Sequence, residues 1–240
     1  MRLVATAWVA MALFAPTLAV GAPQEVWTAR YPLPPGGSVR VANVQGDITI
    51  EGWDRAEAQV VVVKTASEPN GRAEDVQVAV ELSEQALTLR SVYLRPSDAP
   101  IRVDYRLRVP RQGRLERLRT VEGNISVRDF EGPVDARTLN GNIEQENISG
   151  RVVARAVNGN IGVALRGLPE RSAPLHLETV NGHLFLLLPH GANADLELST
   201  VAGRIDSPYA FSVSETPGDT TRKARVGRGG VEIHLRTIRG

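Results

Sequence analysis

The sequence has 240 residues, with 28 Lys or Arg and 27 Asp or Glu, so its formal net charge is +1. A balanced charge creates no overall field that attracts nucleic acid, and nucleic-acid binding is not expected. The chain contains no cysteine, which excludes disulfides, thiolate metal sites, cysteine-based catalysis and a lipid anchor on an N-terminal cysteine.

Residues 1–22 have the composition of a secretory signal peptide. Arg2 precedes an apolar run, and the small-residue sequence LAVGA ends at Ala22, where cleavage is expected. The run is short for a membrane span and is interrupted by Pro16, and no second apolar segment of spanning length follows. We expect an exported protein, periplasmic or extracellular, with no integral membrane span in the mature chain. Loss of Arg2 leaves that chain with 27 basic and 27 acidic residues.

Residues 23–118 are predicted to form an N-terminal β region. A first glycine motif, NVQGDITIEGWD, occupies 43–54. Between 57 and 110, runs such as IRVDYRLRVP at 101–110 alternate apolar and polar residues without regular glycines. Alternation of this kind indicates strands. We expect a wider, partly antiparallel sheet that covers one end of the repetitive part of the chain.

Five nonamers with glycine in third place run from 121 to 165: VEGNISVRD, FEGPVDART, LNGNIEQEN, ISGRVVARA and VNGNIGVAL. Their first, fifth and seventh positions are mostly apolar, so Val121, Gly123, Ile125 and Val127 are expected to face the core from one strand. Because nine is odd, each nonamer needs a corner to keep its apolar side chains inward. An inward glycine beside the corner lets the backbone bend closely around the core.

Alternate nonamers resemble each other most, since TVEGNI, TLNGNI and AVNGNI begin at 120, 138 and 156. This periodicity predicts that residues 119–240 form a β-solenoid, single-stranded and β-helix-like, with about 18 residues per coil. With the N-terminal β region it makes one continuous all-β domain, 23–240. An antiparallel meander is the alternative, because Asn-Gly at 140–141, 158–159 and 181–182 is also a hairpin signal. The glycines assigned a structural role are Gly46, Gly123, Gly132, Gly141, Gly150, Gly159, Gly182 and Gly203.

The last part of the chain is less regular. The glycine motif returns at 179–189 and 200–208, separated from the nonamers by a predicted loop at 167–174. The polar segment 214–230 is predicted to be a loop, and VEIHLRTI at 231–238 a strand. The final RTIRG resembles the opening of a repeat that stays incomplete.

Residues eighteen apart should stack at the strand spacing of roughly 4.8 Å. This places Asn124, Asn142 and Asn160 in an outward ladder, with Glu122, Asn140 and Asn158 beside it. Stacked amides can hydrogen-bond along such a ladder, and we consider it a candidate binding surface. Arg128 should likewise lie over Glu146. A possible basic patch comprises Arg102, Arg106 and Arg108 on one face of a strand, although a solvated strand face explains these arginines as well.

Catalysis is not expected, and neither a cofactor nor a metal site is predicted. The sequence lacks GxSxG, HExxH and the GGxGxD form of calcium-binding nonapeptides. Glu144 and Glu146 would share an outward strand face, which keeps a carbohydrate-active β-helix enzyme open as an alternative.

Two segments, SVRVANVQGDITIEGWD at 38–54 and RTVEGNISV at 119–127, resemble the exported bacterial "putative adhesin" β-strand-repeat domain, a family of unknown function. The resemblance covers about 25–240. It implies a secreted or envelope-associated β-solenoid with no assigned catalytic residues. The leading hypothesis is a non-enzymatic, adhesin-like interaction module that presents a repetitive polar surface to a cell-envelope polymer or protein. A self-assembling structural protein of the envelope is the first alternative.

Overall fold

The computed structural model describes residues 24–66, 73–94, 101–170, 173–216 and 219–240. The predicted signal peptide at 1–22 lies outside these ranges. Within them the protein is all-β, as predicted, with one short 3-10 helix at Ala73–Asp75. The described residues contain no helix that is long and apolar enough to cross a membrane.

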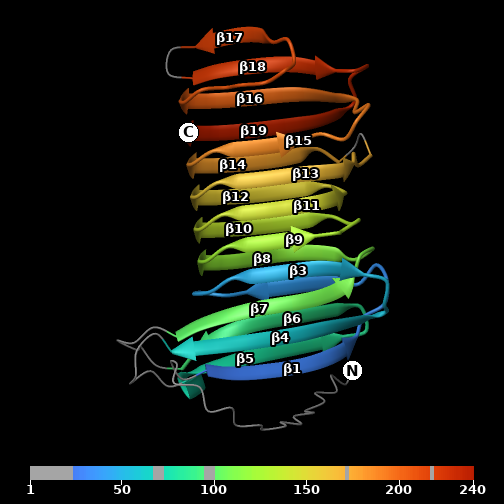
Figure 1. The fold of residues 1–240 in the computed structure, drawn as a ribbon, viewed down its shortest axis with the longest axis vertical. Coiled ribbons are helices and arrows are strands. Elements are labelled where there is room, and N and C mark those ends of the chain that lie inside the picture. The colour runs from blue at the N-terminus through green and yellow to red at the C-terminus, as the bar shows by residue number, and fades with distance from the viewer. Residues whose placement is uncertain (1–23, 67–72, 95–100, 171–172, 217–218) are drawn as a thin grey trace, which may run out of the picture.

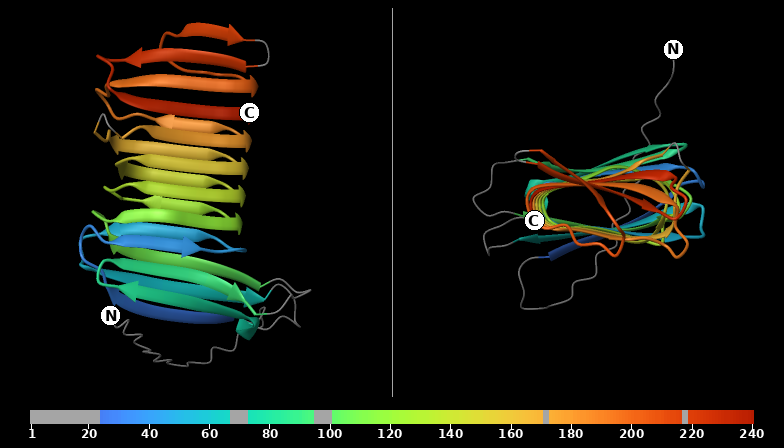
Figure 2. Two further views of the ribbon diagram at one scale, coloured as in Figure 1. Left: turned by 180° about the vertical axis from the view of Figure 1, so that it is seen from behind. Right: turned by 90° about the horizontal axis from the view of Figure 1, so that it is seen from above.

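The strands form two mixed sheets that face each other, and within each sheet the strands follow one another along the long axis of the molecule (Figures 1 and 2). The eight-stranded sheet has the order β1 (Gln24–Pro32), β4 (Glu57–Ala66), β7 (Ile101–Pro110), β3 (Ile48–Trp53), β9 (Ile125–Arg128), β11 (Ile143–Ser149), β13 (Ile161–Gly167), β15 (Leu184–Leu187). The eleven-stranded sheet has the order β17 (Ser212–Thr216), β18 (Asp219–Val226), β16 (Ala194–Ala202), β19 (Val231–Arg239), β14 (Leu175–Asn181), β12 (Val152–Asn158), β10 (Val134–Asn140), β8 (Arg114–Glu122), β2 (Ser38–Ala42), β6 (Ala86–Tyr93), β5 (Val76–Ser83).

Consecutive strands of the repeat region lie in opposite sheets, and each pairs in parallel with the next strand but one. Val134 of β10 is in register with Val152 of β12, and Ile143 of β11 with Ile161 of β13. Both pairs are 18 residues apart, as the sequence period predicts. Because β10 and β11 do not pair with each other, Asn140-Gly141 is not a hairpin turn, and the meander alternative is wrong for these strands.

The corner position was predicted incorrectly. The chain passes from one sheet to the other at the glycine itself: β10 ends at Asn140, β11 begins at Ile143, and Gly141 between them has a φ of 150°. The two sides of the glycine therefore belong to different sheets, and the apolar alternation does not continue through it. As a result Val121 points outward, whereas Ile125 and Val127 are buried.

Corner glycines of successive layers touch through their backbones. A Cβ added to Gly141 would lie 2.0 Å from the carbonyl oxygen of Gly123, and one added to Gly159 would lie 1.9 Å from that of Gly141. No side chain fits at such distances. The contact continues through Gly182, Gly240 and Gly203 at one end and down to Gly46 at the other. On the opposite side of the stack, Gly132 and Gly150 make a similar contact.

The N-terminal region is partly antiparallel, as predicted. Strand β4 pairs antiparallel with β1 and β7, and β5 pairs antiparallel with β6. The early motif joins the stack, because β3 lies in register between β7 and β9.

One expectation for the C-terminal part is wrong. The segment 214–230 is largely β-structure: it ends β17 and contains β18, which pair antiparallel with each other. Ala224 and Val226 are buried, but two apolar residues in a charged segment gave too weak an alternation to indicate a strand. The terminal RTIRG takes the opening position of a repeat, as predicted: Thr237 donates to the carbonyl of Gly182 and Gly240 joins the corner contact, while β19 lies between β14 and β16 and pairs with both.

Gln145 interrupts the otherwise apolar core. It lies on β11 in register with Val127 and Val163, is almost fully buried, and neither its amide oxygen nor its nitrogen has a hydrogen-bond partner in the described structure. An unpaired buried amide costs free energy relative to an apolar side chain.

The corner contacts predict that Gly141→Ala lowers the free energy of unfolding by at least about 1–3 kcal/mol, because of the carbonyl clash and the positive φ. Gly162→Ala is the matched control, since a Cβ there meets nothing within 4 Å. Urea unfolding measures both. Equal stability of the two variants would contradict the contact.

For the buried amide, Gln145→Leu should raise the free energy of unfolding by about 1–3 kcal/mol, because it removes two unpaired polar atoms from the core. The same urea experiment tests it, and a destabilised Gln145→Leu protein would show that the amide is satisfied.

Candidate interaction surface

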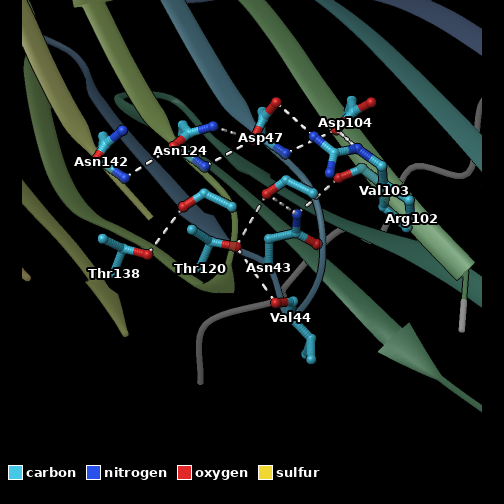
Figure 3. A network of polar contacts seen from close by, with 12 residues as sticks. Asn43, Val44, Asp47, Arg102, Val103, Asp104, Thr120, Asn124, Thr138 and Asn142 are labelled. Carbon is cyan, nitrogen blue, oxygen red and sulfur yellow. Dashed lines mark hydrogen bonds and ion pairs between the residues drawn. The ribbon is translucent and has the colours of Figure 1, made fainter. Parts of the chain in front are cut away.

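The corner asparagines Asn124, Asn142 and Asn160 stack in one column along the repeat, and Figure 3 shows the first two of them. The side-chain Oδ1 of Asn124 accepts a hydrogen bond from the backbone N–H of Asn142 at 2.9 Å, and that of Asn142 accepts one from Asn160 at 2.8 Å. Asp47 does the same for the N–H of Asn124 at 2.7 Å. These side chains therefore hold successive corners together, and their acceptor oxygens are already used within the fold.

Buried and half-buried threonines hydrogen-bond to the backbone of the corners. Thr120, Thr138, Thr179 and Thr237 each donate a hydroxyl hydrogen bond to the carbonyl oxygen of a corner glycine one layer away, at 2.9–3.1 Å. At the N-terminal end Asn43 donates to the carbonyl of Gly46 at 3.1 Å. The sequence analysis missed this role, although a threonine three residues before the glycine recurs in the motifs.

Asn43 belongs to a buried polar cluster. Its Nδ2 also donates to the carbonyl of Val103 at 2.7 Å, and its Oδ1 accepts from the hydroxyl of Ser91 at 2.8 Å. Ser91 in turn shares a 2.7 Å hydrogen bond with Tyr105. Burial raises the pKa of Tyr105 to about 12, so its hydroxyl stays protonated at neutral pH.

A second asparagine column, which we call the amide column, comprises Asn140, Asn158 and Asn181 on the outside of the eleven-stranded sheet. The Nδ2 of Asn158 donates to the Oδ1 of Asn140, and that of Asn181 donates to the Oδ1 of Asn158, both at 2.8 Å. The side chains are exposed. The 18-residue period predicted that Asn140 and Asn158 would stack. Asn181 was missed because the inserted loop before β14 changes the spacing from 18 to 23 residues.

Beside the amide column runs an exposed apolar column, Val121, Leu139 and Val157, whose residues are 39%, 44% and 36% exposed. The residues on either side of Leu139 are in register with their counterparts on β8 and β12, which places the three side chains on adjacent strands. The corner geometry turns these side chains outward. Because the sequence analysis expected Val121 to face the core, it did not predict this column.

An arginine column, Arg119, Arg137 and Arg155, lies on the other side of the apolar column. Arg137 is directly in register with Arg119 on β8 and with Arg155 on β12. Arg137 pairs with Asp135 at 3.1 Å and Arg155 with Glu178 at 3.4 Å. Within the described part of the chain, the Arg119 side chain has no ion pair or hydrogen bond. The 18-residue spacing of these arginines was a usable signal that the sequence analysis did not follow.

The basic patch predicted at Arg102, Arg106 and Arg108 is not a free cationic surface. Arg102 pairs with Asp47 at 2.5 Å and with Asp104 at 2.9 Å, and Arg108 pairs with Glu51 at 2.9 Å. The acids come largely from β3 and the corner before it, and β3 lies directly beside β7. Arg106 is exposed. The ion pairs of Arg102 and Arg108 weaken the field that this patch presents to an anionic partner.

Two other polar features are an exposed pair of glutamates and a stacked pair of histidines. Glu144 and Glu146 are exposed, and Glu146 pairs with Arg128 at 3.2 Å, the contact expected from the sequence. His176 stacks on His234 with ring centroids 4.9 Å apart, and burial is the main cause that lowers the pKa of His176. No group of three or more His, Cys, Asp or Glu in the described ranges is arranged to hold a metal ion.

No family model matches the chain, and no curated protein matches it. Among solved structures it is similar to a "putative cell adhesion protein" from Clostridium sporogenes, with 11% identity over 91% of this chain and 96% of that one and a TM-score of 0.44. It is also similar to a "putative adhesin" from Bacteroides fragilis, with 9% identity over 89% and 94% and a TM-score of 0.44. A "putative lipid binding protein" from Parabacteroides distasonis matches with 11% identity over 67% and 73% and a TM-score of 0.32. At TM-scores below 0.5, these likenesses carry no argument about fold or function.

The two asparagine columns should respond differently to mutation. Asn142→Ala removes the acceptor for the Asn160 N–H and should cost about 0.5–1.5 kcal/mol of unfolding free energy, whereas Asn158→Ala on the exposed column should change it by less than about 0.5 kcal/mol. Asn142→Asp keeps an acceptor, as Asp47 does naturally, and should restore most of the loss in urea unfolding. Equal effects at positions 142 and 158 would contradict the structural role of the corner asparagines.

Proposed function

We propose that this protein is an exported, non-enzymatic, adhesin-like interaction module that binds a polymer or protein of the cell envelope with the outer face of its eleven-stranded sheet. The composition of residues 1–22 supports export to the periplasm or the exterior. The observation that carries the proposal is a set of columns on neighbouring strands: the arginine and apolar columns on β8, β10 and β12, and the amide column on β10, β12 and β14. A repeated surface suits a repeated ligand, since each layer adds a similar contact and the contacts reinforce one another.

We further propose that the repeats form a β-solenoid with about 18 residues per coil, in one continuous domain covering 23–240. Two features support it: parallel registers offset by 18 residues, and consecutive strands that alternate between facing sheets. The corner contacts of Gly123, Gly141 and Gly159 limit movement between layers. A surface held in place before binding loses less entropy on binding.

The proposed face can be tested by co-sedimentation of the purified protein with isolated envelope fractions. The double variant Leu139→Ser with Val157→Ser removes half-exposed aliphatic side chains from the middle of the face, and we expect about tenfold weaker retention or more. Val26→Ser is the matched control, because Val26 is also exposed but lies on edge strand β1 of the other sheet. The proposal fails if the unmodified protein is not retained by any fraction, or if all variants are retained equally.

A second candidate function, self-assembly, is favoured by the edge at β15. The eight-stranded sheet ends there, whereas the facing sheet continues past β14 with four further strands. On β15, Phe185 and Leu187 are 61% and 67% exposed. An edge strand with exposed apolar side chains is a template for pairing with another chain.

Sedimentation velocity over a range of concentrations tests assembly through this edge. Self-association that Phe185→Lys abolishes is the expected result, because a lysine on an edge strand opposes strand addition. A protein that stays monomeric at every concentration would remove this candidate without affecting the first.

A further inference from the structure

The arginine column brings like charges together at the spacing of neighbouring strands, roughly 4.8 Å. Like charges directly opposite each other on a sheet are destabilising. Other repeat positions on the same face carry uncharged residues, such as the apolar column, so the fold itself does not require three stacked arginines. A surface that keeps them despite this cost is suited to an anionic partner.

The charges around the column remain predominantly positive. Asp135 and Glu178 are the carboxylates paired with it in the described structure, at 3.1 Å from Arg137 and 3.4 Å from Arg155. Glu178 is also in register with Arg236 on its other side. Arg119 is exposed and has no such carboxylate. The guanidinium of Arg119 is therefore available to an external acid.

We propose that the arginine column binds a linear acidic polysaccharide, which lies along the stack with its acidic groups on Arg119, Arg137 and Arg155. This inference rests on the proposed function and names the class of ligand for the same face. The planar guanidinium group matches carboxylates in a bidentate geometry. The column runs across the strands, so a linear polymer along the long axis meets one arginine per layer.

The neighbouring columns fit sugars. Val121, Leu139 and Val157 offer an aliphatic surface to the C–H faces of sugar rings. The exposed Asn140 and Asn158 side chains lie one residue beyond the apolar column and provide hydrogen-bonding groups for hydroxyls. Charge, apolar surface and amide groups thus occur in the same order on β10 and β12.

Two other anionic partners fit less well. Single-stranded nucleic acid is held by aromatic stacking in addition to charge, and β8, β10 and β12 contain no aromatic residue. Protein surfaces that contact the membrane–water interface are enriched in Trp and Tyr, and the same three strands contain neither residue. The composition of this face therefore favours a saccharide.

The test uses the purified protein and polygalacturonate as the probe, with binding measured by isothermal titration. The triple variant Arg119→Gln, Arg137→Gln and Arg155→Gln should bind at least about tenfold more weakly. The matched control is Arg106→Gln, Arg108→Gln and Arg128→Gln, which removes the same charge from the outer face of the other sheet and should bind like the unmodified protein. Neutral dextran should not bind.

Other outcomes would overturn the inference. Equal weakening by both triple variants would show a response to net charge alone, and tighter binding of single-stranded DNA, polyphosphate or anionic vesicles would identify another class of partner. Arg119→Gln alone removes the unpaired arginine and should already weaken binding, which keeps the test valid if the triple variant does not fold. If polygalacturonate is not bound but envelope fractions still retain the protein through Leu139 and Val157, this inference fails and the proposed function stands. Loss of both kinds of binding would remove both.

Discussion

The close approach of corner backbones is the constraint on which the rest of the structure depends. At Gly123, Gly141 and Gly159 the backbone of one layer sits against the carbonyl of the layer before it, at a distance that leaves no room for a Cβ. The corner asparagines satisfy the backbone N–H groups there, and the threonines donate to the glycine carbonyls. Together these contacts set the register of both sheets, because each corner connects a strand of one sheet to a strand of the other.

The register in turn explains why similar side chains form columns on the outer surface. Since each layer of the regular repeats is displaced by 18 residues, similar residues at that spacing become columns on the outside. Four such columns follow from the same geometry, and they differ in whether their side chains already bond within the fold. The corner asparagines serve the backbone, whereas the arginine and apolar columns have no comparable structural role.

Local periodicity was sufficient to predict the strands of the regular repeats, their 18-residue register, the stacking of Asn124, Asn142 and Asn160, and the Arg128–Glu146 pair. It did not reveal that the chain changes sheets at the glycine, because an unbroken apolar alternation and a corner give similar patterns around VEGNI and LNGNI. Because of that error the outward column of Val121, Leu139 and Val157 was not predicted. The position of β19 between β14 and β16 is a pairing between distant segments, and no local pattern specifies it. Strand β18 was missed because few of its residues are apolar.

The central claim, that Arg137 stacks on Arg155 while the next strand crosses to the facing sheet, can be measured with pairs of spin labels. The chain has no native cysteine, so Arg137→Cys with Arg155→Cys, and Arg137→Cys with Glu144→Cys, place labels without side reactions. Electron paramagnetic resonance should show strong dipolar broadening for the 137/155 pair and far weaker broadening for the 137/144 pair, whose labels lie on opposite outer faces. The reverse, with labels 137 and 144 closer together, would mean that the strands fold back as hairpins and would contradict the account.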